Sequence, residues 1–237
     1  MSDEKAFLTS YRPKDYPRPS VAVDLVILTI IDAQLRVLLV KRKEHPFKGH
    51  WALPGGFVRV GESAIEQGED LDDAARRELQ EETGLDPQRV FLEQLYTFGK
   101  AGRDPRMRVV TVAYYALVRP DLAPFVKAGG DVSDVEWFDV AVLGKLELAF
   151  DHHDIVEMAL TRIRGKLDYT NIAFDLVPAT FTIPELRHVY GIVLGKPMDP
   201  GNFRRSFNRW LEEGRLEQAP GKRITTSKPA AVYRFKR

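Results

Sequence analysis

The sequence predicts an α/β fold in two parts: a sandwich whose mixed β-sheet is covered by helices on both faces, and a smaller winged helix-turn-helix domain behind it. Up to residue 168, apolar runs rich in β-branched residues alternate with two amphipathic stretches of helical period. Beyond residue 180 the pattern changes to two short helices and a hairpin. A chain of 237 residues is long enough for two such domains. We therefore expect an N-terminal arm at 1–20, the sandwich at 21–168 and the winged helix-turn-helix at 169–237.

The strands of the first part are predicted from runs of aliphatic and aromatic residues bounded by turn residues. The first two runs flank Asp32-Ala33-Gln34 and so predict a hairpin, and the third enters a Gly-Gly turn. In chain order, the expected strands are Val21–Ile31, Leu35–Val40, Trp51–Phe57, Val90–Phe98, Met107–Val118 and Val135–Phe138.

Two helices are predicted in the same part, over Leu71–Thr83 and Asp154–Lys166. Asp70 stands at the N-cap position of the first helix and Asp73 in its first turn, where carboxylates favour a helix. Apolar residues at helical spacing form the buried stripes: Leu71, Ala75 and Leu79 in the first helix, and Ile155, Met158, Ala159 and Ile163 in the second.

The second part, after a connection at 167–180, has the element order of a winged helix-turn-helix. Phe203, Phe207, Trp210 and Leu211 are expected to face inward from its second helix. The first expected helix is capped by Thr182, has Pro184 in its first turn and ends at Gly195. The second covers Gly201–Glu213, begins after Asp199-Pro200 and is ended by Gly214. Two strands are expected at Leu216-Glu217 and Ala231–Phe235, around a basic turn at 220–229.

The strongest functional signal is a trio of carboxylates on the first helix. Glu78, Glu81 and Glu82 are spaced i, i+3 and i+4, so a helix projects them from one face within a single turn. Such carboxylates repel one another unless a hard divalent cation such as Mg²⁺ or Mn²⁺ neutralises them. The alternative is a solvated acidic face on a helix that Gly84 ends. The Gly-Gly turn upstream and the Arg-Glu pair within the stretch favour the metal site.

These residues resemble the Nudix box, G-x5-E-x7-R-E-U-x-E-E-x-G-U, in which U is a bulky aliphatic residue. Gly56 and Glu62 match its first half, Glu69 and Arg77 match the start of its second half, and the stretch 77–85 matches throughout. Seven extra residues separate the halves, so either Glu62 or Glu69 could fill the one glutamate position. We therefore expect a longer loop between the Gly-rich turn and the helix.

The resemblance implies that Glu78, Glu81 and Glu82 hold Mg²⁺ or Mn²⁺, with Glu62 as a further ligand. It also implies that Arg77 pins the loop by ion pairing and joins the three box glutamates in the catalytic set. The candidate substrate-binding residues are Gly55, Gly56 and, in the arm, Arg18.

The charge of the chain is uneven, which indicates a polyanionic partner for the second part. Residues 181–237 contain 12 Lys and Arg against 5 Asp and Glu, a net charge of +7, whereas the rest contains 23 against 29, a net charge of −6. Arg and Asn can read base edges in the major groove, and Arg also holds phosphates. The alternative is an ordinary solvated basic face. The side chains expected on the outer face of the second short helix are Arg204, Arg205, Asn208 and Arg209.

The hairpin tip is also suited to phosphate or minor-groove contact, because it gathers the basic residues Lys222, Arg223 and Lys228 with the hydroxyl residues 225–227. The whole tail resembles the winged-helix domain found behind Nudix domains in bacterial transcription factors, which include regulators of NAD metabolism and sugar-responsive regulators. The resemblance covers nearly the whole chain, including the arm at 11–20.

Several further residues have plainer interpretations. The cluster Asp151-His152-His153-Asp154 is interpreted as a helix start rather than a metal site, because adjacent His residues point to different faces. Asp131, close to Asp134, could be a further carboxylate that acts as a base or a metal ligand, but loop solubility is the better explanation. Trp51 is expected to pack in the core, with base stacking as the alternative. The triplet Lys41-Arg42-Lys43 could face a phosphate, or could simply be a solvated strand end.

Composition excludes several classes of protein. There is no cysteine, which excludes disulfides and thiolate metal sites and fits the cytoplasm. No apolar run approaches the ~18 residues that span a bilayer, and the N-terminal residues lack the form of a signal peptide. We expect a cytoplasmic protein without a membrane partner.

Two functions compete. In the first, the chain is a transcriptional regulator that binds double-stranded operator DNA as a homodimer and senses a nucleoside-diphosphate metabolite such as ADP-ribose. In the second, it is a Mg²⁺-dependent pyrophosphohydrolase acting on such a metabolite. The basic tail favours the first function and the intact carboxylate trio favours the second.

Overall fold

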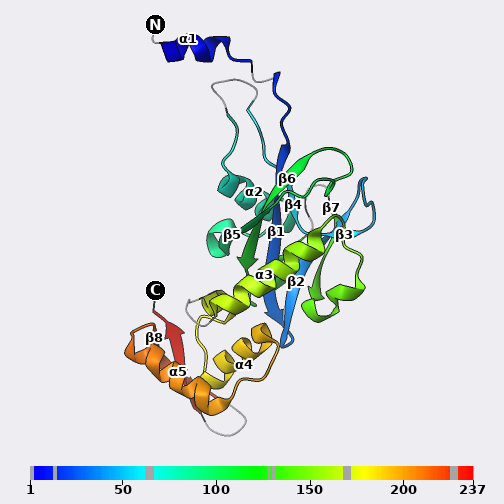
Figure 1. Ribbon diagram of the computed structural model, residues 1–237. Coiled ribbons are helices and arrows are strands. Elements are labelled where there is room, and N and C mark those ends of the chain that lie inside the picture. Colours follow the sequence, from blue (N-terminus) through cyan, green and yellow to red (C-terminus); the bar gives the residue numbers. More distant parts are fainter. Residues whose placement is uncertain are drawn as a thin grey trace.

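The computed structural model describes residues 3–12, 15–61, 67–127, 129, 132–167, 172–224 and 229–236. It contains the two parts that the sequence predicts: a seven-stranded sheet with helices on both faces, and a smaller helical part with a two-stranded sheet at one end (Figure 1). The predicted fold class is therefore confirmed. No helix of the described ranges is long and apolar enough to cross a membrane.

The large sheet is mixed. Its strands follow the order β3-β2-β1-β6-β5, with β4 on β1 and β7 on β2. The central pair, β1 and β6, is parallel, and the other pairs are antiparallel. The strands are β1 (Ser20–Ile31), β2 (Gln34–Arg42), β3 (Trp51–Ala52), β4 (Gly55–Phe57), β5 (Phe91–Phe98), β6 (Val109–Leu117) and β7 (Val132–Asp139).

The stretch 51–57 differs from its prediction, because it forms two short strands on different partners. Val40 and Lys41 of β2 pair with β3, whereas residues 22–24 of β1 pair with β4. The break between them places the Gly-Gly turn beside β1, in the middle of the sheet rather than at its edge.

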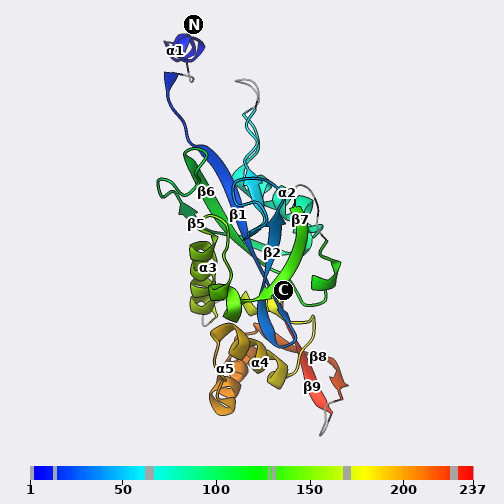
Figure 2. The ribbon, with the colours of Figure 1, turned by 90° about the vertical axis from the view of Figure 1, so that its right-hand side faces the viewer.

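One helix covers each face of the sheet (Figure 2). α2 (Leu71–Thr83) has the predicted bounds, and it buries Ala74, Ala75 and Leu79 against one face. Gly84, at φ 71°, ends it as predicted. Asp70 occupies the N-cap position, but its side chain makes no capping hydrogen bond. α3 (His152–Lys166) covers the other face.

The second part consists of α4 (Ile183–Leu194), α5 (Pro200–Glu212), β8 (Leu216–Arg223) and β9 (Ala230–Phe235). The predicted caps are present: Thr182 forms a capping box with Glu185 on α4, and the Asp199 carboxylate accepts from the Asn202 amide on α5. The expected turn at 220–229 begins later than predicted, because β8 continues to Arg223 after a register shift.

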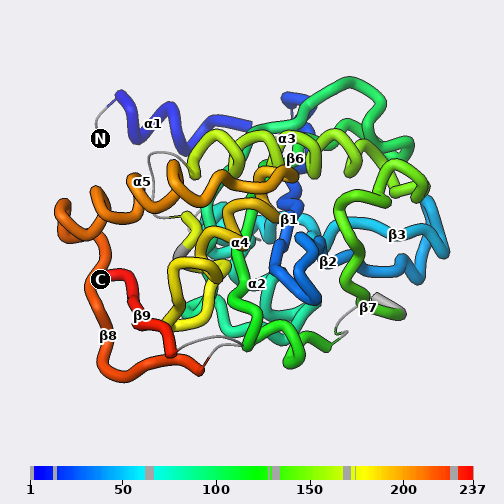
Figure 3. The backbone as a smooth tube through the Cα atoms, turned by 90° about the horizontal axis from the view of Figure 1, so that it is seen from below, coloured from blue at the N-terminus to red at the C-terminus, as the bar shows by residue number. Residues whose placement is uncertain are grey.

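The two parts share one hydrophobic core. Leu160 and Ile163 of α3 belong to the same buried cluster as Leu186 of α4 and Phe203 of α5. The α2 face of the sheet has a separate cluster that contains no residue of the second part. The winged part therefore packs on the α3 side, as the view from below shows (Figure 3).

Before β1, the chain forms a helix that the sequence analysis did not predict, α1 (Asp3–Ser10). It has no buried residue and extends away from the body of the molecule (Figure 1). Its amphipathic moment is weak and its apolar residues Phe7 and Leu8 are both exposed, which explains why no helical stripe is visible in the sequence.

Candidate functional site

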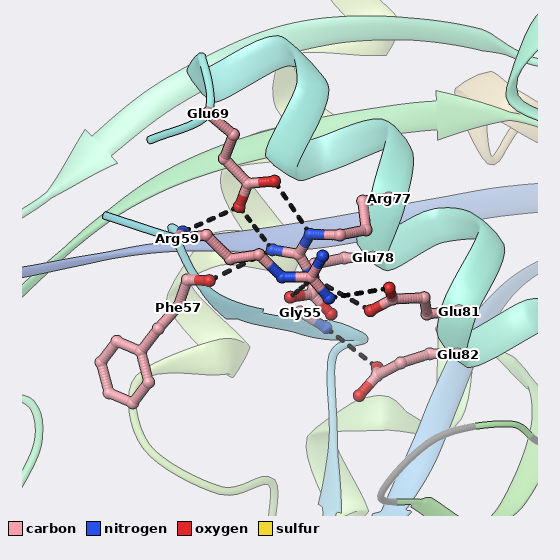
Figure 4. Close-up of polar contacts among 8 residues, drawn as sticks. All are labelled: Gly55, Phe57, Arg59, Glu69, Arg77, Glu78, Glu81 and Glu82. Carbon is pink, nitrogen blue, oxygen red and sulfur yellow. Dashed lines mark hydrogen bonds and ion pairs between the residues drawn. The ribbon is translucent and has the colours of Figure 1, made fainter. Parts of the chain in front are cut away.

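The Gly-Gly turn and α2 meet at one edge of a pocket (Figure 4). The Gly55 amide donates to Oε2 of Glu82 at 3.0 Å. A Cβ atom on Gly56 would lie 2.3 Å from Oε1 of Glu78, and one on Gly55 would lie 2.2 Å from the carbonyl oxygen of Val23. Only glycine therefore allows the turn to approach both β1 and the α2 carboxylates so closely.

Arg77 ties α2 to the loop that precedes it. Its guanidinium donates to both carboxylate oxygens of Glu69, at 2.6 and 2.9 Å, and to the carbonyl oxygen of Phe57 at 3.2 Å. The same group donates to Glu78 at 2.6 Å and to Glu81 at 3.0 Å. The resemblance assigned such a pinning role to this arginine, and the geometry fits that role.

Glu69, on the loop before α2, is the partner of Arg77. This pairing helps to decide whether Glu62 or Glu69 fills the glutamate position of the box. The Arg77 guanidinium lowers the pKa of Glu69 from 4.5 to about 2. Glu62 lies outside the described residues. The contact with Arg77 therefore favours Glu69 for the single glutamate position of the box. The assignment of Glu62 as a metal ligand stays a prediction.

The ion pair of Glu69 should make stability depend on pH. Because its pKa is lowered in the folded protein, the pair stabilises the fold above pH 4.5, and this contribution is lost as the pH falls toward 2. We expect the Glu69→Gln variant to have a lower free energy of unfolding than the wild type at pH 6 and a smaller deficit near pH 3, measured by urea unfolding. Glu157→Gln, which removes an exposed carboxylate on α3, is the control. A deficit that does not change with pH would contradict the assignment.

Three of the four predicted metal ligands, Glu78, Glu81 and Glu82, line the same pocket, but not as a preassembled site. Within the described ranges, no group of three or more His, Cys, Asp or Glu side chains is arranged to hold a metal ion. Arg77 contacts Glu78 and Glu81, and Arg59 also contacts Glu81 at 3.0 Å. Burial raises the pKa of Glu78 against the opposing effect of Arg77. The donor set still fits a hard cation by its chemistry, since all its atoms are carboxylate oxygens facing one pocket.

The pocket has a volume of about 490 Å³ and is lined by groups of both signs. Glu78, Glu81 and Glu82 of α2 line it together with Arg77 of the same helix. Basic side chains from the end of β2 and from the loops after β2 and β5 also line it. These basic residues are Arg42, Lys43, Arg103 and Arg106. A ligand with a polyanionic centre can therefore be held by guanidinium groups, while the carboxylates remain available to a cation.

Aromatic rings alternate with guanidinium groups on the pocket wall. Arg106 lies 5.5 Å from the ring centroid of Phe57 and 6.0 Å from that of Phe150, and Arg42 lies 4.9 Å from Phe150. Asp104 holds Arg106 through two hydrogen bonds, at 2.7 and 3.0 Å. Burial and the neighbouring Arg106 lower the pKa of Arg42. These rings and planar cations form a surface on which a base or a phosphate can be bound.

A buried polar network adjoins the pocket, and three of its members, Asp24, Arg103 and His152, line it. Arg103 donates to Asp151 at 2.5 and 2.9 Å and to Asp24 at 3.3 Å. His152 accepts at Nδ1 from the Leu53 amide at 2.8 Å, and its Nε2 lies 3.6 Å from Asp24. Because Nδ1 is an acceptor, the proton of the neutral ring lies on Nε2, and burial lowers the pKa of His152.

This network was missed by the sequence analysis. The cluster at 151–154 does begin α3, as interpreted, but His152 also lines the pocket. Arg103 and Asp151 are 48 residues apart, and Arg103 and Asp24 are 79 apart. No local spacing connects them, so no sequence motif could have revealed the network.

The remaining candidates differ in whether they line the pocket. Arg18 is exposed and is not among the residues that line the pocket. Trp51 packs with its ring centroid 4.8 Å from that of Phe138, with the Lys41 ammonium over its ring. Of the basic triplet, Arg42 and Lys43 line the pocket. Asp131 lies outside the described residues.

A second candidate surface lies on α5. Phe203, Phe207 and Trp210 are buried, so the helix presents its opposite face to solvent. Arg205 on that face donates to the side chain of Asn202. The four predicted DNA-contacting residues of this helix are all exposed: Arg204, Arg205, Asn208 and Arg209.

The hairpin contributes a smaller basic surface than predicted. Lys222 is exposed, whereas Arg223 donates to Glu185 at 2.6 Å and to the carbonyl oxygen of Thr180 at 3.0 Å. Arg223 thus fastens β8 to the start of α4, and its contact with DNA stays a prediction. Lys228 and residues 225–227 lie outside the described residues.

Comparison with protein families gives two matches that together cover most of the chain. Residues 21–158 match the NUDIX domain, and residues 173–235 match the NrtR DNA-binding winged helix domain. The first match contains the pocket, and the second contains α4, α5 and the hairpin.

Individual relatives agree with this division. The chain is 39% identical over 234 residues to the ADPR responsive transcriptional repressor NtrR of Acinetobacter baylyi, covering 99% of this chain and 89% of the relative. It is 41% identical over 154 residues to the ADP-ribose pyrophosphatase of Methanocaldococcus jannaschii, covering 65% of this chain and 79% of that enzyme. Among solved structures, Shewanella oneidensis NrtR complexed with a 27mer DNA has a TM-score of 0.76 at 37% identity, covering 91% of this chain and 93% of that one.

Proposed function

Because this chain belongs to the Nudix family and combines its Nudix domain with an NrtR-type winged helix, we propose that it is a ligand-responsive transcriptional repressor. In this function α5 binds operator DNA and the pocket beside α2 senses ADP-ribose or a related nucleoside diphosphate. The observation that carries the proposal is the exposed face of α5, where three arginines and one asparagine lie opposite a buried aromatic face. A hydrolase acting alone has no need of such a surface.

The composition of the pocket supports the choice of ligand. A volume of about 490 Å³ lies within the range of small-molecule sites. Arg103 and Arg106 can hold a diphosphate through paired hydrogen bonds, and the rings of Phe57 and Phe150 offer flat surfaces to a base. The relative from Acinetobacter baylyi is described as responsive to ADPR, which agrees with this reading of the pocket.

A second candidate function is hydrolysis of the same ligand, favoured by the intact glutamates of α2. Glu78, Glu81 and Glu82 would hold Mg²⁺ or Mn²⁺. When bound, such a cation offsets charge on the diphosphate and lowers the pKa of a water molecule. Arg77 keeps the carboxylates on one face and pins the Gly-rich turn to α2. The 41% identity to an ADP-ribose pyrophosphatase also supports this activity.

The proposed repressor acts as a homodimer in the cytoplasm. Two recognition helices about one DNA turn, roughly 34 Å, apart can grip two half-sites of an operator. A ligand that rotates one Nudix domain against the other would misplace both helices.

We expect ADP-ribose to lower the affinity of the protein for operator DNA by about 1–3 kcal/mol, the usual range of coupling between two sites. The experiment is fluorescence anisotropy on a duplex from the promoter next to its own gene, with and without ADP-ribose. By linkage, this DNA must weaken ADP-ribose binding by the same factor. Equal affinity for ADP-ribose in calorimetry with and without the duplex would rule out the regulatory function and leave an enzyme that binds DNA.

A further inference from the structure

α3 connects the pocket to the winged-helix domain. At its start, Phe150 and His152 line the pocket. At its end, the Arg164 Nε donates to the carbonyl oxygen of Val193 on α4 at 3.1 Å. Fifteen residues of helix span about 22 Å. A displacement at the pocket end can therefore reach α4 through one rigid element.

Helices α3 and α4 pack against each other through buried apolar side chains. Leu160, Ile163 and Leu167 at the end of α3 share a buried cluster with Leu186 and Val193 of α4. Close-packed side chains transmit displacement rather than absorb it, because the interior has few voids. Helix α5, the proposed recognition helix, has buried residues in the same cluster. We therefore expect α4 and α5 to move together with the end of α3.

Arg103 connects the pocket to the start of α3. One guanidinium nitrogen, Nη2, lies 2.5 Å from Asp151 and 3.3 Å from Asp24, so the group bridges α3 and β1. Its side chain is only 5% exposed, yet it lines the pocket. The bridge is therefore buried against the protein on one side and open to a ligand on the other.

The backbone at this junction is in an uncommon conformation. Phe150, immediately before the bridging Asp151, has φ 55°, in the left-handed region that residues with a Cβ rarely adopt. Its ring is held between Phe47, with centroids 4.8 Å apart, and the Arg42 guanidinium, 4.9 Å from the ring centroid. Of these two contacts, the one with Arg42 lies in the pocket, and a ligand that displaces the Arg42 guanidinium can release the strained conformation.

We propose that the Asp24–Arg103–Asp151 bridge transmits ligand binding to the DNA-binding domain. An anionic diphosphate in the pocket competes with the two carboxylates for Arg103. Asp151 then loses its partner, the turn at Phe150 relaxes, and the start of α3 moves, taking α4 and α5 with it. The inference rests on the proposed function, because it assumes that the pocket senses an effector of DNA binding.

The other three arginines of the pocket are not placed for this role. Arg77 pairs with glutamates of α2 and of the loop before it. Arg106 pairs with Asp104, two residues away on the same loop. Arg42 donates to the carbonyl oxygen of Pro46, also close by in sequence. Of the four arginines that line the pocket, only Arg103 pairs with a carboxylate at the start of α3.

The test is the Asp151→Asn variant, which removes the charge on α3 while keeping the shape of the side chain. Asp151 does not itself line the pocket, and calorimetry checks that the variant still binds ADP-ribose. In anisotropy with the promoter duplex, ADP-ribose should weaken wild-type binding about 5- to 150-fold, the usual coupling range. The variant without ligand should already bind as weakly as the liganded wild type, and ADP-ribose should change its affinity less than about threefold, well below that range.

Asp154→Asn is the matched control, because it removes one exposed carboxylate from the first turn of the same helix. It should keep the wild-type response. A second pair tests the far end: Arg164→Gln loses the contact with α4, whereas Arg162→Gln loses a contact with Leu95 on β5. Arg164→Gln should reduce the effect of ADP-ribose on DNA affinity, while its own affinity for ADP-ribose in calorimetry stays unchanged. Arg162→Gln should not reduce that effect.

The outcomes separate this inference from the proposed function. If the wild type responds to ADP-ribose and both Asp151→Asn and Arg164→Gln respond equally, the bridge does not transmit the signal. If the wild type itself does not respond, the proposed regulatory function fails and the relay fails with it. If Asp151→Asn does not fold, as judged by circular dichroism, the Arg164→Gln and Arg162→Gln pair decides alone.

Discussion

The double variant Glu81→Gln, Glu82→Gln is expected to abolish Mg²⁺-dependent cleavage of ADP-ribose while leaving the protein folded. Removing two of the three carboxylates lowers the affinity for a divalent cation, and without that cation the lowered pKa of its bound water is lost. The fall in rate should reach several orders of magnitude, down to the rate without metal. The measurement is release of AMP from ADP-ribose across a Mg²⁺ titration.

The structure explains why this pair is suited to the test. The Glu81 side chain is 45% exposed, so its replacement disturbs no core packing. At Glu82, a glutamine keeps an oxygen that can accept from the Gly55 amide. Glu78, which is buried and paired with Arg77, is left unchanged. Asp73→Asn removes a carboxylate from the same helix at a position that does not line the pocket, and it serves as the control.

Two results would change the assignment. Cleavage by the double variant at the wild-type rate would remove these glutamates from the mechanism. A wild type that binds ADP-ribose without cleaving it would be a sensor alone, in which Arg77 and Arg59 supply the charge that offsets the carboxylates.

The second large effect is expected from Arg204→Ala with Arg205→Ala. Both side chains are exposed on the face of α5 opposite Phe203 and Phe207, so their loss should weaken DNA binding without unfolding the domain. Each phosphate contact that is lost should lower the slope of log affinity against log salt by about one unit per protomer. An arginine that reads a guanine should instead cost about 1–3 kcal/mol and relax specificity at one position.

The measurement is anisotropy on the promoter duplex and on an unrelated duplex over a range of salt concentrations. Arg76→Ala with Arg89→Ala removes two exposed arginines from the Nudix domain and so matches the change in net charge. If both double variants weaken binding equally, the effect comes from the overall charge of the protein. The assignment of α5 as the DNA-binding helix would then be wrong.

Much of the fold could be predicted because its signals are local. The bounds of α2 follow from apolar spacing within 13 residues and from Gly84, and the carboxylate trio follows from the period of the same helix. The starts of α4 and α5 follow from Thr182 and Asp199, whose side chains each accept from an amide three residues away. In each case the interacting groups are neighbours in sequence, so spacing alone reveals them.

Other features depend on where the chain runs in space. The split of 51–57 into β3 and β4 depends on pairing with two different strands. β8 includes Pro220 because this residue falls within the register shift between Gln218 and Lys222, where the pairing with β9 is irregular. Helix α1 has no apolar face that a pattern search could detect.

The sequence by itself determined the chemistry of this protein: a carboxylate face on α2, a glycine turn beside it and a basic helix in the tail. These depend on residue type and short-range periodicity, which the printed chain shows directly. Only the tertiary structure decided that Glu69 pairs with Arg77, that Arg103 bridges Asp24 and Asp151, and that α3 shares its core with the winged-helix domain. The Glu69–Arg77 pair spans eight residues, across the junction of a loop and a helix. The other contacts join elements far apart in sequence, so their partners are selected by packing and burial rather than by spacing.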